Sequence, residues 1–240
     1  MRIPRLYIDA ELTEGRELAL PADRFNYLKN VLRLRPKSPV LAFDGRGLEA
    51  EAVFLPEKKS GKLIIGAVRA RSAESPLQLH LLQGISKGER MDLVIQKAVE
   101  LGVNRITPVA MTRSVVDLKG DRADKRLARW REIAINACEQ CGRNHLPLID
   151  PISTLPAALA QVNPDAHKWV LHTNATQAAS ATAIEKAALV IGPEGGLTEQ
   201  EVAHCLTSGF ATLWLGPRIL RTETAAIAAL AIMQARYGDM

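Results

Sequence analysis

The pattern of hydrophobic and polar positions changes near residue 75. Before that point, apolar and polar residues alternate over short runs, as in the strands of a half-buried sheet. Within 40–55, two such runs flank Asp44-Gly45-Arg46-Gly47, a typical hairpin turn. Predicted strands cover 5–9, 40–55 and 61–72, and one predicted helix covers 22–34. Residues 1–72 are therefore predicted to form a small β-rich domain of barrel type.

Beyond residue 75 the spacing becomes that of an α/β protein. Ser, Glu and Pro dominate 72–76, which is predicted to be a linker. Predicted strands then cover 77–85, 105–110, 167–173, 187–196 and 211–218. Predicted helices cover 87–103 and 122–141, and two more begin near Thr198 and Thr222. Alternating strands and helices predict a parallel sheet with helices on both faces, in a second domain spanning 77–240.

Charge is distributed unevenly along the 240 residues. The excess of Lys and Arg over Asp and Glu is +4 in residues 1–75, +3 in 76–150 and −2 in 151–240. A basic front is typical of a protein that contacts a polyanion, although an ordinary solvated surface explains it equally well. No apolar run is long enough to span a membrane, and the first residues lack the apolar core of a secretory signal. We therefore expect a cytoplasmic protein.

The three cysteines are Cys138, Cys141 and Cys205, and the first two form a C-x-x-C. A structural zinc ion needs four ligands, and His145 is the one further candidate nearby. Since 122–141 is predicted to be helical, both thiols would lie one turn apart on a half-buried face. The sequence thus favours structural thiols and predicts no metal.

Three loops at the ends of predicted strands carry the candidate chemistry. They are Leu171-His172-Thr173-Asn174, 191–197 (IGPEGGL) and 215–224 (LGPRILRTET). Ligands of a parallel sheet bind at the carboxyl ends of its strands, and glycines let the backbone approach them closely. The glycine patterns of phosphate-binding loops and dinucleotide sites are missing, and Glu194 would repel a phosphate. If the loops are more than tight turns, they suit a cationic or zwitterionic ligand.

The segments IGPEGGLTEQE and LGPRILRTETAA resemble the C-terminal signature of the SPOUT methyltransferases. The resemblance is greatest to the ribosomal RNA small subunit methyltransferase E family, which methylates N3 of a uridine in 16S rRNA. MRIPRLY, KGERMDLVIQKAVELGV and ACEQCGR resemble that family too. Two positions depart from its pattern: Tyr27, where the family often has His, and His172-Thr173, where it often has His-Pro.

The resemblance implies a trefoil knot in the C-terminal third, a PUA-like N-terminal barrel and a homodimer acting on 16S rRNA. It also implies that the three loops bind S-adenosylmethionine. The expected cofactor-binding residues are Leu171, His172, Ile191, Gly192, Pro193, Glu194, Gly195, Gly196, Leu215, Gly216, Ile219, Leu220, Thr222 and Thr224. A structural role for His172 is equally compatible with its place in a loop.

Two further residues are expected to act on the uridine. N3 becomes nucleophilic only when it loses its proton, so the enzyme must favour the imide anion. Arg221 is expected to stabilise negative charge on the uracil carbonyls, and Glu223 to accept the proton or hold Arg221. The structural alternative is an ion pair at a helix N-terminus, where Glu is favoured in any case.

RNA contacts are expected from basic residues of the front domain, with more from the catalytic domain, mainly through phosphates. The candidates are Arg2, Arg5, Arg24, Lys29, Arg33, Arg35, Lys87, Arg90, Arg113 and Arg143. Two alternatives stay open at this point. One is a ribose 2′-O methyltransferase of the same superfamily, and the other is an RNA-binding ribosome-assembly protein without catalysis. A nicotinamide oxidoreductase is disfavoured because the glycine fingerprint is missing.

Overall fold

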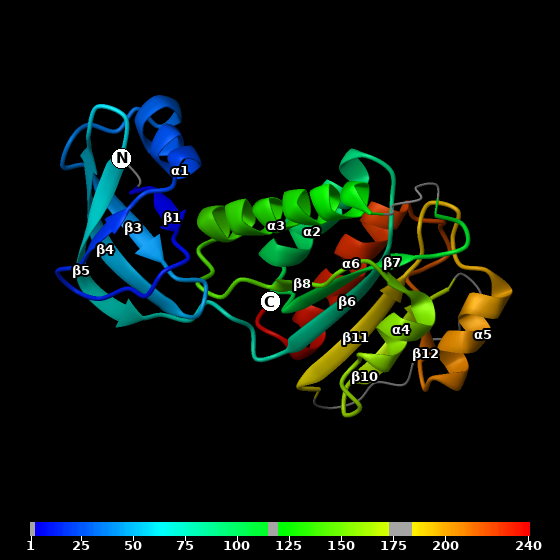
Figure 1. The fold of residues 1–240 in the computed structure, drawn as a ribbon. Helices are drawn as coiled ribbons and strands as arrows, with labels where there is room; N and C mark the ends of the chain where they lie inside the picture. Colours follow the sequence, from blue (N-terminus) through cyan, green and yellow to red (C-terminus); the bar gives the residue numbers. More distant parts are fainter. Residues whose placement is uncertain (1–2, 115–119, 173–183) are drawn as a thin grey trace. The chain divides into compact units, whose positions relative to one another are not determined.

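The computed structural model describes residues 3–114, 120–172 and 184–240 (Figure 1). The chain divides into two compact units. The N-terminal unit contains 1–74 together with 138–146, and the C-terminal unit contains 75–137 and 147–240. The expected domains, 1–72 and 77–240, are each one continuous stretch, whereas in the structure the segment 138–146 belongs with the N-terminal unit.

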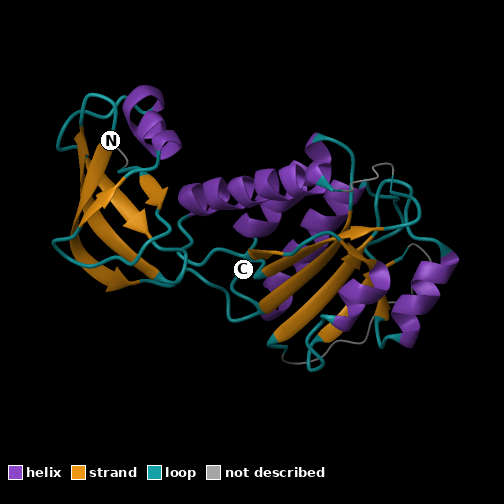
Figure 2. Ribbon diagram, in the orientation of Figure 1, coloured by secondary structure: helices purple, strands orange, loops and turns teal. Residues whose placement is uncertain are grey.

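The N-terminal unit is built on a five-stranded sheet in the order β1-β3-β4-β5-β2 (Figure 2). β1 pairs with β3 in parallel, and the other pairs are antiparallel. The strands are β1 (Arg5–Tyr7), β2 (Glu17–Ala19), β3 (Pro39–Phe43), β4 (Leu48–Pro56) and β5 (Gly61–Ala70). In β4 and β5 alternate side chains are buried, as the sequence pattern predicted. Inward-facing Leu6, Leu28, Phe54, Leu63 and Ile65 form the centre of the core.

The helix expected over 22–34 is shorter and changes type. It consists of α1 (Ala22–Asn26) followed by a π-helical turn, η1 (Tyr27–Val31). It ends because Arg33 adopts a left-handed backbone conformation with φ of 52°, which a helix cannot continue through. The wide turn buries Leu28 fully and leaves Val31 exposed. Apolar spacing alone does not distinguish a π turn from an α turn.

The C-terminal unit contains a fully parallel sheet in the order β12-β10-β11-β6-β7-β8, with β9 also paired to β7. Its strands are β6 (Gln78–Gly84), β7 (Arg105–Ala110), β8 (Leu148–Ile149), β9 (Ser153–Thr154), β10 (His167–Leu171), β11 (Lys186–Ile191) and β12 (Ala211–Leu213). Its helices are α2 (Glu89–Glu100), α3 (Asp121–Cys141, whose last turn lies in the N-terminal unit), α4 (Leu155–Ala160), α5 (Glu199–Thr207) and α6 (Thr222–Tyr237). The predicted α/β class with a parallel sheet is confirmed.

Helices cover both faces of this sheet (Figure 1). Val170 and Val190 pack in one apolar cluster with residues of α4 and α5. Trp169, whose side chain points to the opposite face, stacks on Tyr237 of α6 with ring centroids 6.4 Å apart. The threading of the C-terminal third into a knot stays a prediction. Within the described residues, no helix is both long enough and apolar enough to cross a membrane.

Candidate active site

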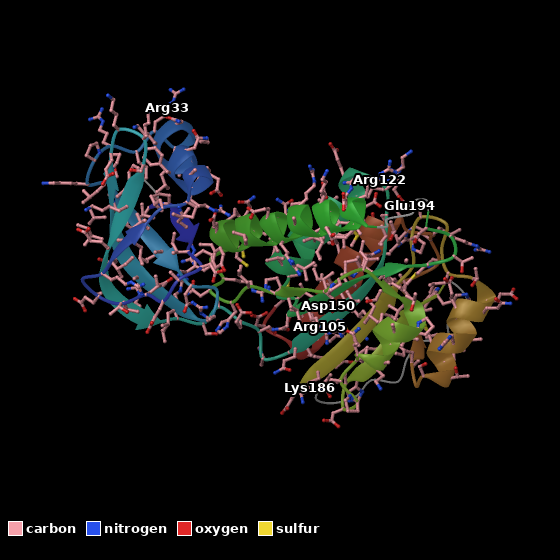
Figure 3. The ribbon with its side chains drawn as sticks, viewed as in Figure 1. Arg33, Arg105, Arg122, Asp150, Lys186 and Glu194 are labelled. Atoms are coloured by element: carbon pink, nitrogen blue, oxygen red, sulfur yellow. The ribbon has the colours of Figure 1, made fainter. Side chains whose placement is uncertain are left out.

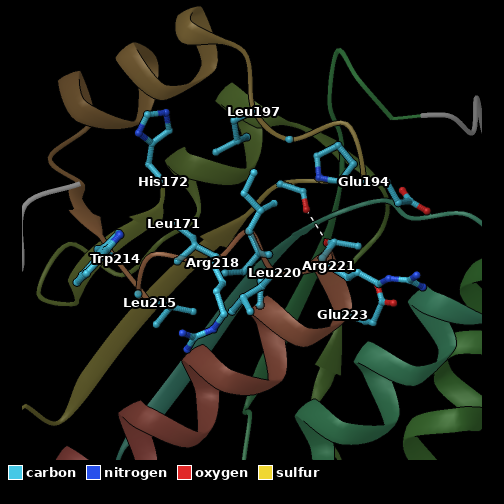
Figure 4. A pocket seen from close by; sticks show the side chains of 18 of the residues that line it. Leu171, His172, Glu194, Leu197, Trp214, Leu215, Arg218, Leu220, Arg221 and Glu223 are labelled. Atoms are coloured by element: carbon cyan, nitrogen blue, oxygen red, sulfur yellow. Dashed lines mark hydrogen bonds between the residues drawn. The ribbon is translucent and has the colours of Figure 1, made fainter. Parts of the chain in front are cut away.

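A cavity of about 440 Å³ lies at the carboxyl ends of β10, β11 and β12 (Figure 4). All three sequence-predicted loops contribute to its wall. Every expected cofactor-binding residue lines it except Gly195 and Thr224, and Arg221 and Glu223 line it too. Figure 4 shows Leu171 and Leu215 on one side of the cavity, with Glu194, Arg221 and Glu223 on the other. The size is typical of a pocket for a small molecule.

A buried hydroxyl ties two of the loops together. Gln83 Nε2 donates to Thr222 Oγ1 at 3.0 Å, and the Thr222 hydroxyl donates to the Gly192 carbonyl at 2.6 Å. Gly84, the last residue of β6, packs directly against the 191–197 loop, because a Cβ at this position would lie 2.5 Å from the Pro193 nitrogen. The Thr222 hydroxyl is therefore engaged in holding the loops, although the residue lines the cavity.

The other end of the 191–197 loop is fixed by a helix cap and by an arginine. Thr198 and Glu201 form a capping box at the start of α5. Arg113 Nη1 donates to the carbonyls of Gly195 and Leu197 at 3.1 and 3.3 Å. A Cβ on Gly195 would lie 2.8 Å from the Arg113 Cβ, so this glycine packs against Arg113 instead of lining the cavity. Arg113 was expected to contact RNA, but its guanidinium donates hydrogen bonds to this loop.

Two glycines on the cavity wall have backbones that side chains disfavour. Gly196 has φ of +70° and Gly216 has φ of +107°. A Cβ built on either would meet no atom of the described residues within 4 Å. The wall at these two points is thus bare backbone facing open space, which lets a flat ligand lie directly against the chain.

Glu194 supplies a negative charge to this wall. Its Oε1 accepts hydrogen bonds from the Lys87 backbone N–H at 2.8 Å and from Arg90 Nη1 at 2.9 Å. Burial acts to raise its pKa, but hydrogen bonds from the Lys87 and Glu194 backbone amides and from Arg90 outweigh it, so the pKa is lowered. Its Oε2 is buried and has no hydrogen-bond partner among the described residues. An unsatisfied buried carboxylate oxygen is unfavourable, so this atom suits a positively charged hydrogen-bond donor on a ligand.

Arg221 and Glu223 flank the start of α6. Arg221 occupies the N-cap position and is exposed, and Glu223 lies in the first turn. Glu223 Oε2 is also buried without a partner in the described part of the chain. A carboxylate in the first turn is stabilised by the helix dipole, but that does not explain why one of its oxygens is left unsatisfied.

Five residues line the cavity that were not assigned to it from the sequence: Arg90, Leu197, Trp214, Arg218 and Ala225. Four of them adjoin or lie within the predicted loops, and their position beside the expected cofactor-binding residues was the available signal. Arg90 comes from α2, far away in the sequence, and no local pattern links it to the loops. Trp214 is 41% exposed and Ile219 is 88% exposed, which is unusual for large apolar side chains and typical of a binding site.

Two expected RNA contacts are wrong because the side chains are buried. Arg5 is 9% exposed, and its Nη1 donates to Glu49 Oε2 at 2.9 Å while Nη2 donates to Asn144. Arg143 is 4% exposed and pairs with Glu74, Nε to Oε1 at 3.0 Å. Both guanidiniums neutralise carboxylates inside the N-terminal unit, so neither can reach a phosphate.

The remaining residues that were expected to contact RNA differ in their exposure and in their contacts within the protein. Arg24 pairs with Glu139 at 3.6 Å, and Lys29 donates to the Glu57 carbonyl at 3.2 Å. Arg33, Arg35 and Lys87 are exposed. Arg2 lies outside the described residues, as do Thr173 and Asn174 of the first loop.

The cysteines lie away from this cavity. Burial raises the pKa of Cys138 to about 12 and that of Cys205 to about 11, so both thiols stay protonated. A protonated thiol is neither a nucleophile nor a good metal ligand. Within the described residues, no group of three or more His, Cys, Asp or Glu side chains could hold a metal ion.

Comparison with known proteins agrees with this geometry. The RNA methyltransferase domain family matches residues 73–234, and the RNA methyltransferase PUA domain family matches residues 20–65. Ribosomal RNA small subunit methyltransferase E of Buchnera aphidicola is 36% identical over 247 residues, covering 100% of this chain and 98% of the relative.

Two solved structures cover 100% of this chain and are themselves covered completely. A methyltransferase from Legionella pneumophila in complex with S-adenosylmethionine is 38% identical with a TM-score of 0.95. Ribosomal RNA small subunit methyltransferase E from Neisseria gonorrhoeae bound to S-adenosylmethionine is 41% identical with a TM-score of 0.92. The chain therefore belongs to the RNA methyltransferases, and among them to the ribosomal RNA small subunit methyltransferase E family.

Proposed function

We propose that this protein transfers a methyl group from S-adenosylmethionine to N3 of a uridine in 16S rRNA. The observation that carries the proposal is the cavity made by the three loops. Its wall includes two glycines, Gly196 and Gly216, that face open space, and two carboxylates, Glu194 and Glu223, that each have a buried oxygen without a partner in the described residues. Support comes from two similar proteins that were solved with S-adenosylmethionine bound. The named relatives modify RNA of the small ribosomal subunit, which makes 16S rRNA the substrate class we propose.

The residues of the cavity fit this cofactor. Leu171, Leu215 and Leu220 would pack against the adenosine, and Gly196 would let it lie on the backbone. The free Oε2 of Glu194 would accept from a cationic group of the methionine part. When bound, S-adenosylmethionine supplies a methyl group that is already activated by a positively charged sulfur.

The chain must then make uridine N3 nucleophilic. Arg221 would stabilise negative charge on a uracil carbonyl as the N3–H bond breaks. Glu223 would accept the N3 proton on its unpartnered Oε2, leaving the nitrogen lone pair free to attack. Both side chains line the cavity on the side opposite Leu171, as Figure 4 shows.

RNA binding would involve both units. The exposed Arg33 and Arg35 of the N-terminal unit and the exposed Lys87 of the C-terminal unit are the candidates we favour, since the exposed Arg90 and Arg113 donate to Glu194 and to the Gly195 carbonyl. We further propose a homodimer that acts in the cytoplasm, where 16S rRNA is assembled into subunits.

The direct test is to incubate the protein with isotopically labelled S-adenosylmethionine and 16S rRNA from a strain that lacks the enzyme. Nucleoside mass spectrometry should find the label on one uridine, as 3-methyluridine. Label on a ribose 2′-oxygen would overturn the base assignment. Cofactor binding without any transfer to RNA would overturn the proposed activity.

Replacement of Arg221 tests the mechanism. Arg221→Ala should lower the single-turnover rate by about 10²- to 10⁴-fold, with little change in affinity for RNA or cofactor. Arg221→Lys should recover only part of the rate, because an ammonium lacks the planar fork of guanidinium. Raising the pH should partly restore Arg221→Ala, since hydroxide then helps to remove the N3 proton. A rate loss that is fully matched by lost cofactor binding would contradict a catalytic role.

A further inference from the structure

A second hollow adjoins the cofactor cavity in the C-terminal unit. This groove has a volume of about 620 Å³ and runs between α2 and α3. Arg90, Arg221 and Glu223 line both the groove and the cofactor cavity. A ligand in the groove and a ligand in the cavity would therefore meet at Arg221 and Glu223.

The groove combines an apolar surface with alternating charges. Leu93 of α2 is 38% exposed in it, and Ile133 of α3 lies across from α2. Asp92 Oδ2 accepts from Arg129 Nε at 2.9 Å, an ion pair that links the two helices. The other oxygen, Asp92 Oδ1, is buried and has no partner among the described residues, as is the case for Glu223 Oε2.

This chemistry matches the imide edge of uracil. That edge presents a carbonyl, an N–H and a second carbonyl, so it needs a donor, an acceptor and a donor from the protein. Arg90, Arg129 and Arg221 line the groove as hydrogen-bond donors, and the carboxylates of Glu89, Asp92 and Glu223 line it as acceptors. The apolar side chains suit the flat face of the base. Cytosine, whose N3 carries no hydrogen, matches the carboxylates less well.

A basic stripe on α3 leads to the groove. Arg122, Arg126, Arg129 and Ile133 recur at the three- and four-residue spacing that places side chains on one helical face. Arg129 and Ile133 line the groove, so the first two arginines continue the same face toward the start of α3. Figure 3 labels Arg122 at that end. Such a row of guanidiniums is suited to successive phosphates.

We propose that the groove between α2 and α3 binds the target nucleotide, with the flipped-out base against Leu93 and Ile133. The phosphates of the same RNA strand would lie along Arg122 and Arg126. Enzymes that modify a base must take it out of its stack, and a groove that opens onto the cofactor cavity supplies the place for it. This inference rests on the proposed methyltransferase function.

Leu93→Trp tests the groove by filling it. Methylation of 16S rRNA should lose at least about tenfold in kcat/KM, while calorimetric affinity for S-adenosylmethionine stays within about twofold. The matched control is Leu206→Trp, because Leu206 is 47% exposed on α5 and lines neither hollow. It should leave both quantities unchanged.

Arg126→Glu gives a second test that does not alter the groove. It should weaken RNA binding and flatten its salt dependence, whereas Arg131→Glu, on the opposite face of α3, should do neither. Normal methylation by folded Leu93→Trp would overturn the groove assignment and leave the proposed function intact. A change of oligomeric state in Leu93→Trp, seen by analytical ultracentrifugation, would overturn the assignment as well, and would show that the groove binds a second copy of this chain. Failure of the unaltered protein to methylate would instead overturn the proposed function.

Discussion

At the residue scale, the polar groups in and near the two hollows are of two kinds. Some have all their hydrogen-bond partners within the protein, and others do not. Thr222 and Glu201 have partners on both sides and fix the loops. Glu194, Glu223 and Asp92 each keep one buried oxygen without a partner in the described residues. Since buried acceptors are rarely left unsatisfied, these three carboxylates are the residues that we expect to be completed by cofactor or RNA.

A different buried group, His80, should make the fold sensitive to acid. His80 Nε2 lies 2.7 Å from Thr107 Oγ1, and burial, assisted by the charge of Arg105, lowers the His80 pKa from 6.5 to about 4. Between these two values the unfolded chain binds a proton that the folded protein excludes. Stability should therefore be unaffected by His80 above pH 6.5 and should fall as the pH drops toward 4, by on the order of 3 kcal/mol in all.

Urea denaturation across that range measures the effect. His80→Gln should show a smaller loss of unfolding free energy between pH 6.5 and 4 than the unaltered protein. His204→Gln, which alters an exposed histidine of α5, should follow the unaltered protein. If His80→Gln keeps the full pH dependence, other groups cause it.

At the scale of elements, long periodic segments were predictable and short ones were not. The strands from 77 to 110 and the helices α2 and α3 follow from apolar spacing, whereas α6 is apolar around most of its circumference and only its start near Thr222 was expected. β8, β9 and α4 are too short to show a period, and the π turn of η1 has no pattern of its own. Two of the three loops, 191–197 and 215–224, were predictable because glycine and proline mark them, whereas the loop after residue 171 was placed only by the end of its predicted strand. That Gly195 faces Arg113 was not, because the contact joins residues far apart in the sequence.

The 191–197 loop offers a test of how the elements form the cofactor site. Gly196 and Gly209 both have positive φ, +70° and +84°, and at both an added Cβ meets no described atom within 4 Å. Valine should therefore strain the backbone similarly at the two positions, by about 1–3 kcal/mol. Only at Gly196 does it also enter the cavity. Calorimetry should show at least about tenfold weaker binding of S-adenosylmethionine for Gly196→Val than for Gly209→Val. Equal affinities would remove this loop from the cofactor site.

At the scale of the whole molecule, the sequence located the excess of positive charge but not its use. Arg5, Arg69 and Arg71 all pair with the fully buried Glu49, and Arg143 pairs with Glu74. Arg143 and Glu74 lie 69 residues apart in the sequence, and Arg5 and Glu49 lie 44 apart, so charge counts along the sequence could not identify these pairs. Ion pairing leaves the net charge at +5, but the buried Arg5 and Arg143 are not among the arginines that present it to RNA.

Arg35 should be one of the residues through which that charge acts on RNA. Its side chain is exposed, and its backbone N–H is held by Ser38 Oγ at 3.1 Å. It is a better probe than Arg33, where replacement also disturbs a left-handed backbone. Arg35→Glu should weaken RNA binding and reduce the slope of log affinity against log salt by about 0.7 to 0.9 per lost phosphate contact.

Lys186→Glu is the control for this prediction. It makes the same change in net charge at the start of β11, the end of the strand opposite the cofactor cavity, and should have a much smaller effect. Fluorescence anisotropy over a salt series gives both slopes. Equal slopes for the two variants would show that net charge alone attracts the RNA and that Arg35 makes no phosphate contact.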